Sequence, residues 1–154
     1  MTDVSTPAIY VDGDACPVKD EVVRVAVRHK LDVFMVSNAW LRKAVGPRVH
    51  SIVVAEGADA ADDWIAEHAG KGDIVITSDI PLASRSIEKG ALVLGPTGKP
   101  FTPDGIGMAL AMRDLNAHLR ETGEIKGYNA SFTRNDRSRF LQALDQAIQK
   151  SKRR

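Results

Sequence analysis

Acidic residues follow two of the short apolar runs in this sequence. Asp12 and Asp14 come directly after residues 8–11, and Asp79 follows residues 74–78. Such runs are typical of buried strands, and the carboxyl ends of parallel strands meet at one edge of a sheet, where open α/β folds bind ligands. Clustered carboxylates repel one another, and a divalent cation relieves that repulsion. Because oxygen ligands alone favour Mg²⁺ or Mn²⁺, we expect a site for one of these ions.

A further acidic group opens a predicted helix over residues 59–69. Asp59, Asp62 and Asp63 have the spacing i, i+3 and i+4, which places them on one face of its first turn. The helix dipole stabilises acids at this position, so ordinary helix-start residues are the alternative interpretation. Asp79 has a similar alternative, because it precedes an Ile-Pro pair as an N-cap residue would.

Alternating strands and helices must position these acids. Short apolar runs predict strands, and apolar residues at helical spacing predict the helices between them. Nearly continuous apolar strands favour a parallel sheet that is covered on both faces, and 154 residues suit one domain of this α/β class. The predicted strands are residues 8–11, 33–37, 51–55, 74–78 and 91–94, and the predicted helices between them are residues 17–30, 59–69 and 81–89.

Two C-terminal helices are predicted beyond this alternating part. Each carries an apolar stripe at helical spacing, and we expect the methionines of the first stripe to pack in the core. The stripes are Met108, Met112, Leu115 and Leu119 in the first helix, and Phe140, Leu141, Leu144, Ala147 and Ile148 in the second.

Composition and charge exclude several classes of protein. Four of the 21 basic residues lie in a predicted tail at 150–154, and the remaining 17 face 20 acidic residues within a predicted domain over 1–149. A domain with this slight excess of acidic residues does not bind nucleic acid by charge alone. The apolar runs fall far short of the roughly 20 residues that span a bilayer. The start lacks a secretory signal and a single cysteine excludes an internal disulfide, so we expect a cytoplasmic protein with no membrane partner.

Three other features have a functional and a structural interpretation each. Cys16 lies near a helix N-cap, which favours its thiolate, but no His lies nearby in sequence as a base, so we expect a structural role. Arg113 interrupts an apolar helix and either clamps a phosphate or forms a surface ion pair. Residues 126–140 mix basic with aromatic side chains, which suits either a single nucleic-acid strand or a polar loop.

The segment from Val11 to Glu21, VDGDACPVKDE, closely resembles the opening signature of the YaiI/YqxD family of uncharacterised bacterial proteins, in which Ala usually replaces Gly13. That family resembles a branch of the PIN-like nuclease superfamily, in which acids at strand ends and on a helix hold Mg²⁺ or Mn²⁺ and a water attacks a phosphodiester. Other segments that agree in order and spacing are residues 36–38, 57–62, 72–83 and 112–114.

The resemblance implies a PIN-like domain with a mainly parallel, five-stranded sheet in the order 3-2-1-4-5. It also implies a Mg²⁺- or Mn²⁺-dependent hydrolase that acts on nucleic acid, with RNA as the expected substrate and partner. Asp14 is an added family feature, and either Asp59 or Asp62 supplies the helix ligand. The implied metal-binding and catalytic residues are Asp12, Asp14, Asp62 and Asp79, and the implied substrate-binding residues are Asn38, Ser78 and Arg113.

Two other functions fit the same residues. The run Asp12-Gly13-Asp14 after an apolar strand matches the opening of haloacid-dehalogenase-like phosphatases, with Asp12 as nucleophile and Asp14 as general acid. Against this, Cys16 stands where those phosphatases usually have Thr or Val, and Asp73 precedes its strand instead of closing it. A non-catalytic RNA-binding module with the same fold is the third interpretation.

Overall fold

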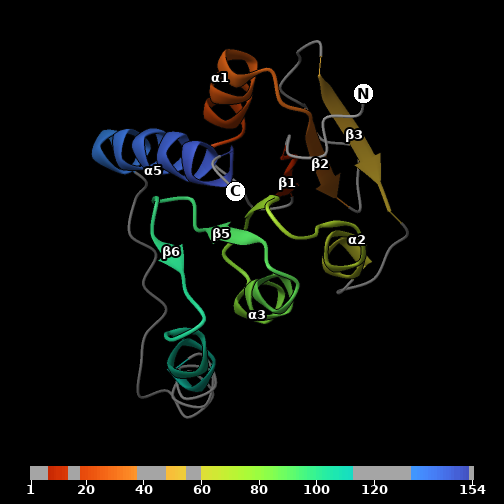
Figure 1. Cartoon of the computed structure of the whole chain (residues 1–154), viewed down its shortest axis with the longest axis vertical. Coiled ribbons are helices and arrows are strands. Elements are labelled where there is room, and N and C mark those ends of the chain that lie inside the picture. The colour runs from red at the N-terminus through yellow and green to blue at the C-terminus, as the bar shows by residue number, and fades with distance from the viewer. Residues whose placement is uncertain (1–6, 14–17, 38–47, 55–59, 113–132, 153–154) are drawn as a thin grey trace.

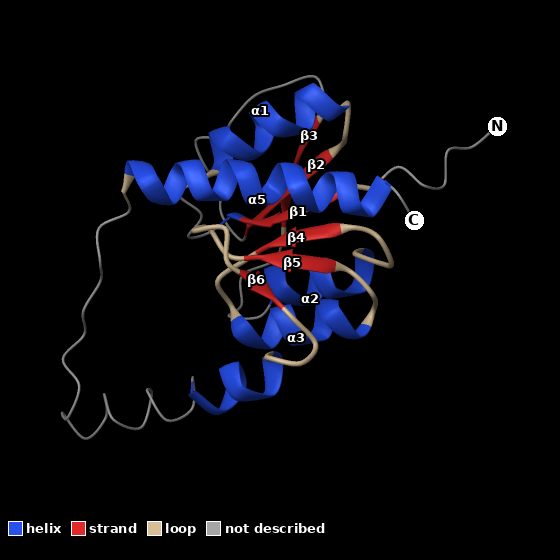
Figure 2. Cartoon of the chain, turned by 60° about the vertical axis from the view of Figure 1, so that its left-hand side comes forward, coloured by secondary structure: helices blue, strands red, loops and turns tan. Residues whose placement is uncertain are grey.

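The computed structural model describes residues 7–13, 18–37, 48–54, 60–112 and 133–152. They form one α/β domain (Figure 1) around a six-stranded sheet in the order β3-β2-β1-β4-β5-β6, whose strands are all labelled in Figure 2. The strands are β1 (Ile9–Asp12), β2 (Val33–Ser37), β3 (Val49–Val53), β4 (Ile74–Ile76), β5 (Leu92–Leu94) and β6 (Pro100–Phe101). The helices are α1 (Lys19–His29), α2 (Ala60–His68), α3 (Ile80–Glu88) and α5 (Arg134–Lys152), with a further helical segment at 106–112.

The predicted α/β class and the order of the first five strands are confirmed. β1 to β5 pair in parallel. The predicted number of five strands is wrong, because β6 pairs antiparallel with β5. A two-residue run that begins with Pro100 shows no strand pattern in the sequence, and a proline is tolerated there because β6 is an edge strand. β3 also begins two residues before its predicted start, at Val49.

Helices cover both faces of the sheet (Figure 2), and each face carries a hydrophobic layer of its own. Ile9 and Val11 of β1 face α1 and α5, whereas Tyr10 between them faces α2 and α3, as the alternation of strand side chains requires. α5 contributes Phe140, the largest of the fully buried side chains among the described residues. Its predicted stripe is confirmed, because the side chains of Phe140, Leu144 and Ile148 are fully buried.

Ionic contacts between α1 and α5 supplement this packing. His29 Nε2 lies 2.6 Å from Asp145 Oδ1, and the guanidinium of Arg137 donates to Glu21 Oε2 at 2.9 Å. The hydrogen bond from His29 is the main reason that the pKa of Asp145 lies below its usual value. Both contacts join residues 116 positions apart, so they fix α5 against the first helix of the chain.

The methionine stripe is not in the core. Met108 is 69% exposed and Met112 is 46% exposed, which corrects the expectation that they are buried. The segment at 106–112 lies beyond α3, at the far end of the molecule from α1 (Figure 1). The two sheet faces are covered by α1 and α5 and by α2 and α3, and Ile106 of this segment packs against the second layer whereas Met108 and Met112 do not. Leu115 and Leu119 lie outside the described residues.

The end of α5 is tied to the sheet. The helix runs through Lys152, so residues 150–152 continue it where the sequence predicted the start of a tail. Ser151 is buried, and its hydroxyl donates to the carbonyl oxygen of Gly72, just before β4. Arg153 and Arg154 lie outside the described residues. No helix within the described part of the chain has the length and apolar character needed to cross a membrane.

Candidate active site

The strand order places a topological switch point between β1 and β4. From β1 the chain moves outward through β2 to β3, and it then returns to β4 on the other side of β1. In open parallel sheets the crevice at such a point, at the carboxyl ends of the two strands, is the usual ligand site. Asp12 is the last residue of β1, and residues 77–79 directly follow β4. The predicted acids Asp12 and Asp79 therefore both lie at the carboxyl ends of these two neighbouring strands.

The hydroxyl of Thr77 joins the two sides of the crevice. It donates a hydrogen bond to Asp12 Oδ2 at 3.1 Å and accepts one from the backbone N–H of Asp79 at 2.9 Å. Thr77 is 3% exposed, and its own N–H donates to the carbonyl of Leu94 in β5. Because the hydroxyl donates one hydrogen bond and accepts another, its orientation is well defined. It fixes the Asp12 carboxylate relative to the start of the loop that carries Asp79.

Asp79 is an N-cap residue. Its Oδ1 accepts a hydrogen bond from the Leu82 N–H at 2.9 Å, at the start of α3, and Pro81 occupies an early helix position. The capping interpretation of Asp79 is therefore confirmed. A carboxylate has two oxygens, and within the described ranges the second one, Oδ2, has no hydrogen-bond partner. Capping is thus compatible with a second role for Asp79.

The acids of α2 divide into two kinds. Asp63 is exposed and pairs with Arg85 of α3, its Oδ1 lying 2.8 Å from the guanidinium. Asp62 is half-buried on the first turn of α2. Asp63 thus forms a surface ion pair between α2 and α3. Of the two acids that the resemblance offers as the helix ligand, Asp62 is the one within the described residues.

Within the described ranges, no three His, Cys, Asp or Glu side chains lie close enough together to hold a metal ion. Ser78 is exposed beside Asp79. The other predicted site residues lie outside the described residues: they are Asp14, Cys16, Asn38, Asp59 and Arg113. The described part of the site is therefore the pair Asp12 and Asp79 with the linking hydroxyl of Thr77.

Thr77 is the residue that the sequence-based prediction missed. The signal was present, because Thr77 stands between an apolar strand and Ser78-Asp79. A threonine at the end of a strand is also an ordinary β residue, so its type alone does not reveal a contact with Asp12.

Asp73 lies at the amino ends of the strands, directly before β4. Its Oδ1 accepts from the N–H of Ala8 at 3.0 Å, and its Oδ2 accepts from the N–H of Gly70 at 2.9 Å. These bonds fix the turns before β1 and β4, at the amino ends of the strands. Asp73 therefore has a structural role and does not extend the crevice at the carboxyl ends.

Comparison with known proteins places this scaffold in a family. The family model described as "Uncharacterized BCR, YaiI/YqxD family" matches residues 10–150. The chain belongs to the YaiI/YqxD family. Similar members include a UPF0178 protein of Agrobacterium fabrum, 60% identical over 147 residues and covering 96% of each chain. Another, from Mesorhizobium japonicum, is 61% identical over 145 residues and covers 94% of each chain.

A more divergent UPF0178 protein, from Bradyrhizobium diazoefficiens, is 54% identical over 154 residues, which is 100% of this chain and 92% of its own. No solved structure matches the chain. The YaiI/YqxD match runs from β1 to the last turns of α5 and so includes both sides of the crevice. The names of these relatives assign no activity to the family.

Proposed function

We propose that this YaiI/YqxD protein is a metal-dependent phosphodiester hydrolase that acts on RNA. The observation that carries the proposal is the meeting of Asp12 and the Asp79 loop at the switch point, through the hydroxyl of Thr77. Carboxylate oxygens from two neighbouring strand ends suit Mg²⁺ or Mn²⁺, which keep several waters and bridge phosphate oxygens. The PIN-like resemblance of the segments that carry these residues supports the same chemistry.

Each residue has a defined part in this proposal. Asp12 and Asp79, through its Oδ2, would hold the ion, and Asp14 and Asp62 would complete or adjust its surroundings. Thr77 positions Asp12 by the hydrogen bond that it donates. A Mg²⁺ or Mn²⁺ ion held there would lower the pKa of a water and neutralise charge on the phosphoryl oxygens. The residues that orient the water or the phosphate are Ser78, Asn38 and Arg113, and the products carry a 5′-phosphate and a 3′-hydroxyl.

Calorimetric titration with Mn²⁺ tests the metal site. We expect Asp12→Asn and Asp79→Asn each to weaken Mn²⁺ binding at least tenfold, because each removes a charged ligand. Asn remains a good N-cap, so Asp79→Asn should preserve the start of α3. The matched control is Asp63→Asn. In the parent protein the Asp63 carboxylate pairs with Arg85, so this variant should bind Mn²⁺ with unchanged affinity. Unchanged Mn²⁺ affinity in both site variants would refute the proposal.

Incubation with a labelled single-stranded oligoribonucleotide tests the reaction. We expect cleavage that needs Mg²⁺ or Mn²⁺ and is lost in Asp12→Asn. RNA that is retained on a filter in EDTA, but never cleaved with metal, would instead indicate a binding module. Rapid quenching with a phosphomonoester addresses the phosphatase alternative, because only that reaction leaves phosphate on Asp12.

A further inference from the structure

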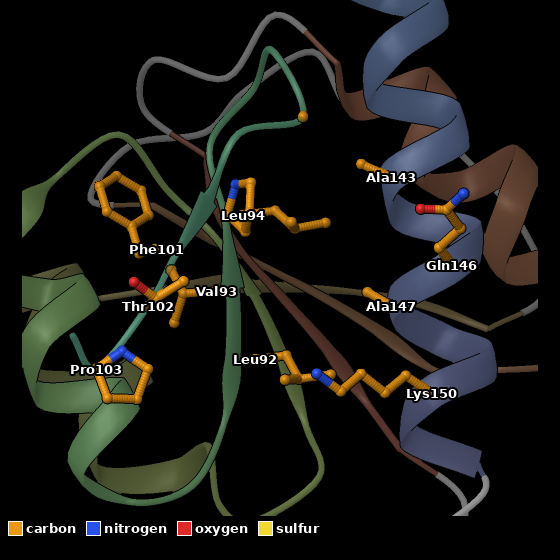
Figure 3. Close-up of a pocket in the computed structure, with 12 residues that line it drawn as sticks. Leu92, Val93, Leu94, Phe101, Thr102, Pro103, Ala143, Gln146, Ala147 and Lys150 are labelled. Carbon is orange, nitrogen blue, oxygen red and sulfur yellow. The ribbon is translucent and has the colours of Figure 1, made fainter. Parts of the chain in front are cut away.

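A pocket lies between α5 and the β5–β6 end of the sheet (Figure 3). Its volume is about 380 Å³, within the range of small-molecule sites. Leu92, Leu94 and Pro100 line it from the strands, and Ala143 and Ala147 line it from α5. The two alanines are short, so this part of α5 leaves space over the sheet edge. None of the residues predicted for the active site lines the pocket.

Lys150 gives the pocket its charge. It is the one charged residue among the lining side chains, and in Figure 3 it extends from α5 toward β5, on the side of Leu92. In the part of the chain that the structure describes, no carboxylate or hydrogen-bond acceptor contacts its amine. The amide of Gln146 and the hydroxyl of Thr102 add neutral polar groups to the lining.

An apolar surface beside one unpaired cation defines the chemistry of a ligand. A neutral apolar molecule would leave the ammonium of Lys150 without an anion, and an inorganic anion would leave the leucine and proline surface exposed to water. Lys150 is exposed, so water solvates its ammonium in the free protein. A ligand that covers the apolar lining displaces part of that water, and an ionised hydrogen-bond acceptor replaces it best. An amphipathic anion pairs with the ammonium and covers the apolar lining at the same time.

We propose that this pocket binds a small carboxylate with an apolar chain, such as a medium-chain fatty acid free in solution. The carboxylate accepts a hydrogen bond from the ammonium of Lys150, on the side of Leu92 (Figure 3). The chain lies on Leu92, Leu94 and Pro100, against the alanines of α5. The pocket holds the volume of about a dozen water molecules, which accommodates such a chain. The proposal is independent of the metal site and of RNA.

Calorimetric titration with sodium octanoate tests the proposal on the full chain at low salt. We expect octanoate to bind, and octanol, which has the same chain without the charge, to bind at least tenfold more weakly. Lys150→Gln should weaken octanoate at least tenfold and leave octanol unchanged. The control is Arg24→Gln, because Arg24 is exposed on α1, outside the pocket lining. Failure of octanoate to bind, or equal binding of octanoate and octanol, would overturn the proposal.

A second variant tests the location without changing the charge. Ala147→Leu places a larger side chain in the pocket, and we expect it to weaken octanoate at least tenfold. Urea unfolding of the variant establishes that it remains folded, and Ala143→Leu is the substitute if it does not. Full octanoate affinity in a folded filling variant would place the ligand elsewhere. Asp12→Asn should leave octanoate binding unchanged, so the outcome is separate from that of the metal titration.

Discussion

The hydroxyl of Thr77 should contribute strongly to stability, and replacing it with a methyl group measures how much. Thr77→Val keeps the shape of the side chain but removes the donor to Asp12 and the acceptor for the Asp79 N–H. A hydrogen bond to a charged group is worth about 1.5–3 kcal/mol and one between neutral groups about 1 kcal/mol. We therefore expect the free energy of unfolding to fall by about 3 kcal/mol. For a chain of this length, the melting temperature should fall by about 6–12 °C.

Urea unfolding of the parent, Thr77→Val and Thr77→Ser provides the measurement. Serine keeps the hydroxyl and loses one methyl group, which costs about 1 kcal/mol in a buried position. The valine variant should therefore unfold at a lower urea concentration than the serine variant, with the same dependence on urea in all three proteins. Equal stability of the two variants, or a valine variant as stable as the parent, would refute the role assigned to the hydroxyl.

Three further predictions concern α3 and α5. Asp79→Ala should lower the free energy of unfolding by about 1 kcal/mol through loss of the N-cap, whereas Asp79→Asn should cost much less; equal losses in urea would contradict capping. Asp145 has a depressed pKa in the folded protein, so the stability it gains from His29 is present above about pH 4 and is lost as the pH falls through the folded pKa. Asp145→Asn should therefore reduce the acid sensitivity of the urea midpoint, and an unchanged pH profile would argue against this linkage. Leu144→Ala should lower the free energy of unfolding by about 2–5 kcal/mol because Leu144 is fully buried. Gln142 is exposed on the same helix, so Gln142→Ala should change that free energy by no more than about 0.5 kcal/mol. Similar urea midpoints for the two variants would contradict the assigned packing of α5.

The sheet could be predicted well from the sequence because its central strands are buried on both faces. Ile9–Val11 and Ile74–Ile76 are continuous apolar runs, and burial on both sides of a parallel sheet requires that pattern. β6 has only two residues and begins with proline, so no periodicity could reveal it. Met108 and Met112 show a second reason for a wrong prediction. An apolar helix face identifies a helix, but it does not determine which surface, if any, covers that face.

The candidate site was predictable only in part. The rule for strand ends correctly placed Asp12 and the Asp79 loop at the carboxyl ends of neighbouring strands, since it depends on topology alone. The contact through Thr77 depends on side-chain geometry between residues 65 positions apart, which no local pattern carries. Capping by Asp79 was visible in the sequence as an alternative, because the signal lies within three residues of it.

The position of α5 in the chain has a consequence for synthesis. Phe140, Leu144 and Ile148 cover the sheet face that includes Ile9 and Val11, yet they follow all six strands in the sequence. On the ribosome, a nascent chain that already contains every strand and α1 therefore still exposes the part of this apolar face that α5 covers, until α5 emerges. During that interval chaperones have an apolar surface to bind, and a translational stall before residue 140 would leave the intermediate prone to aggregation.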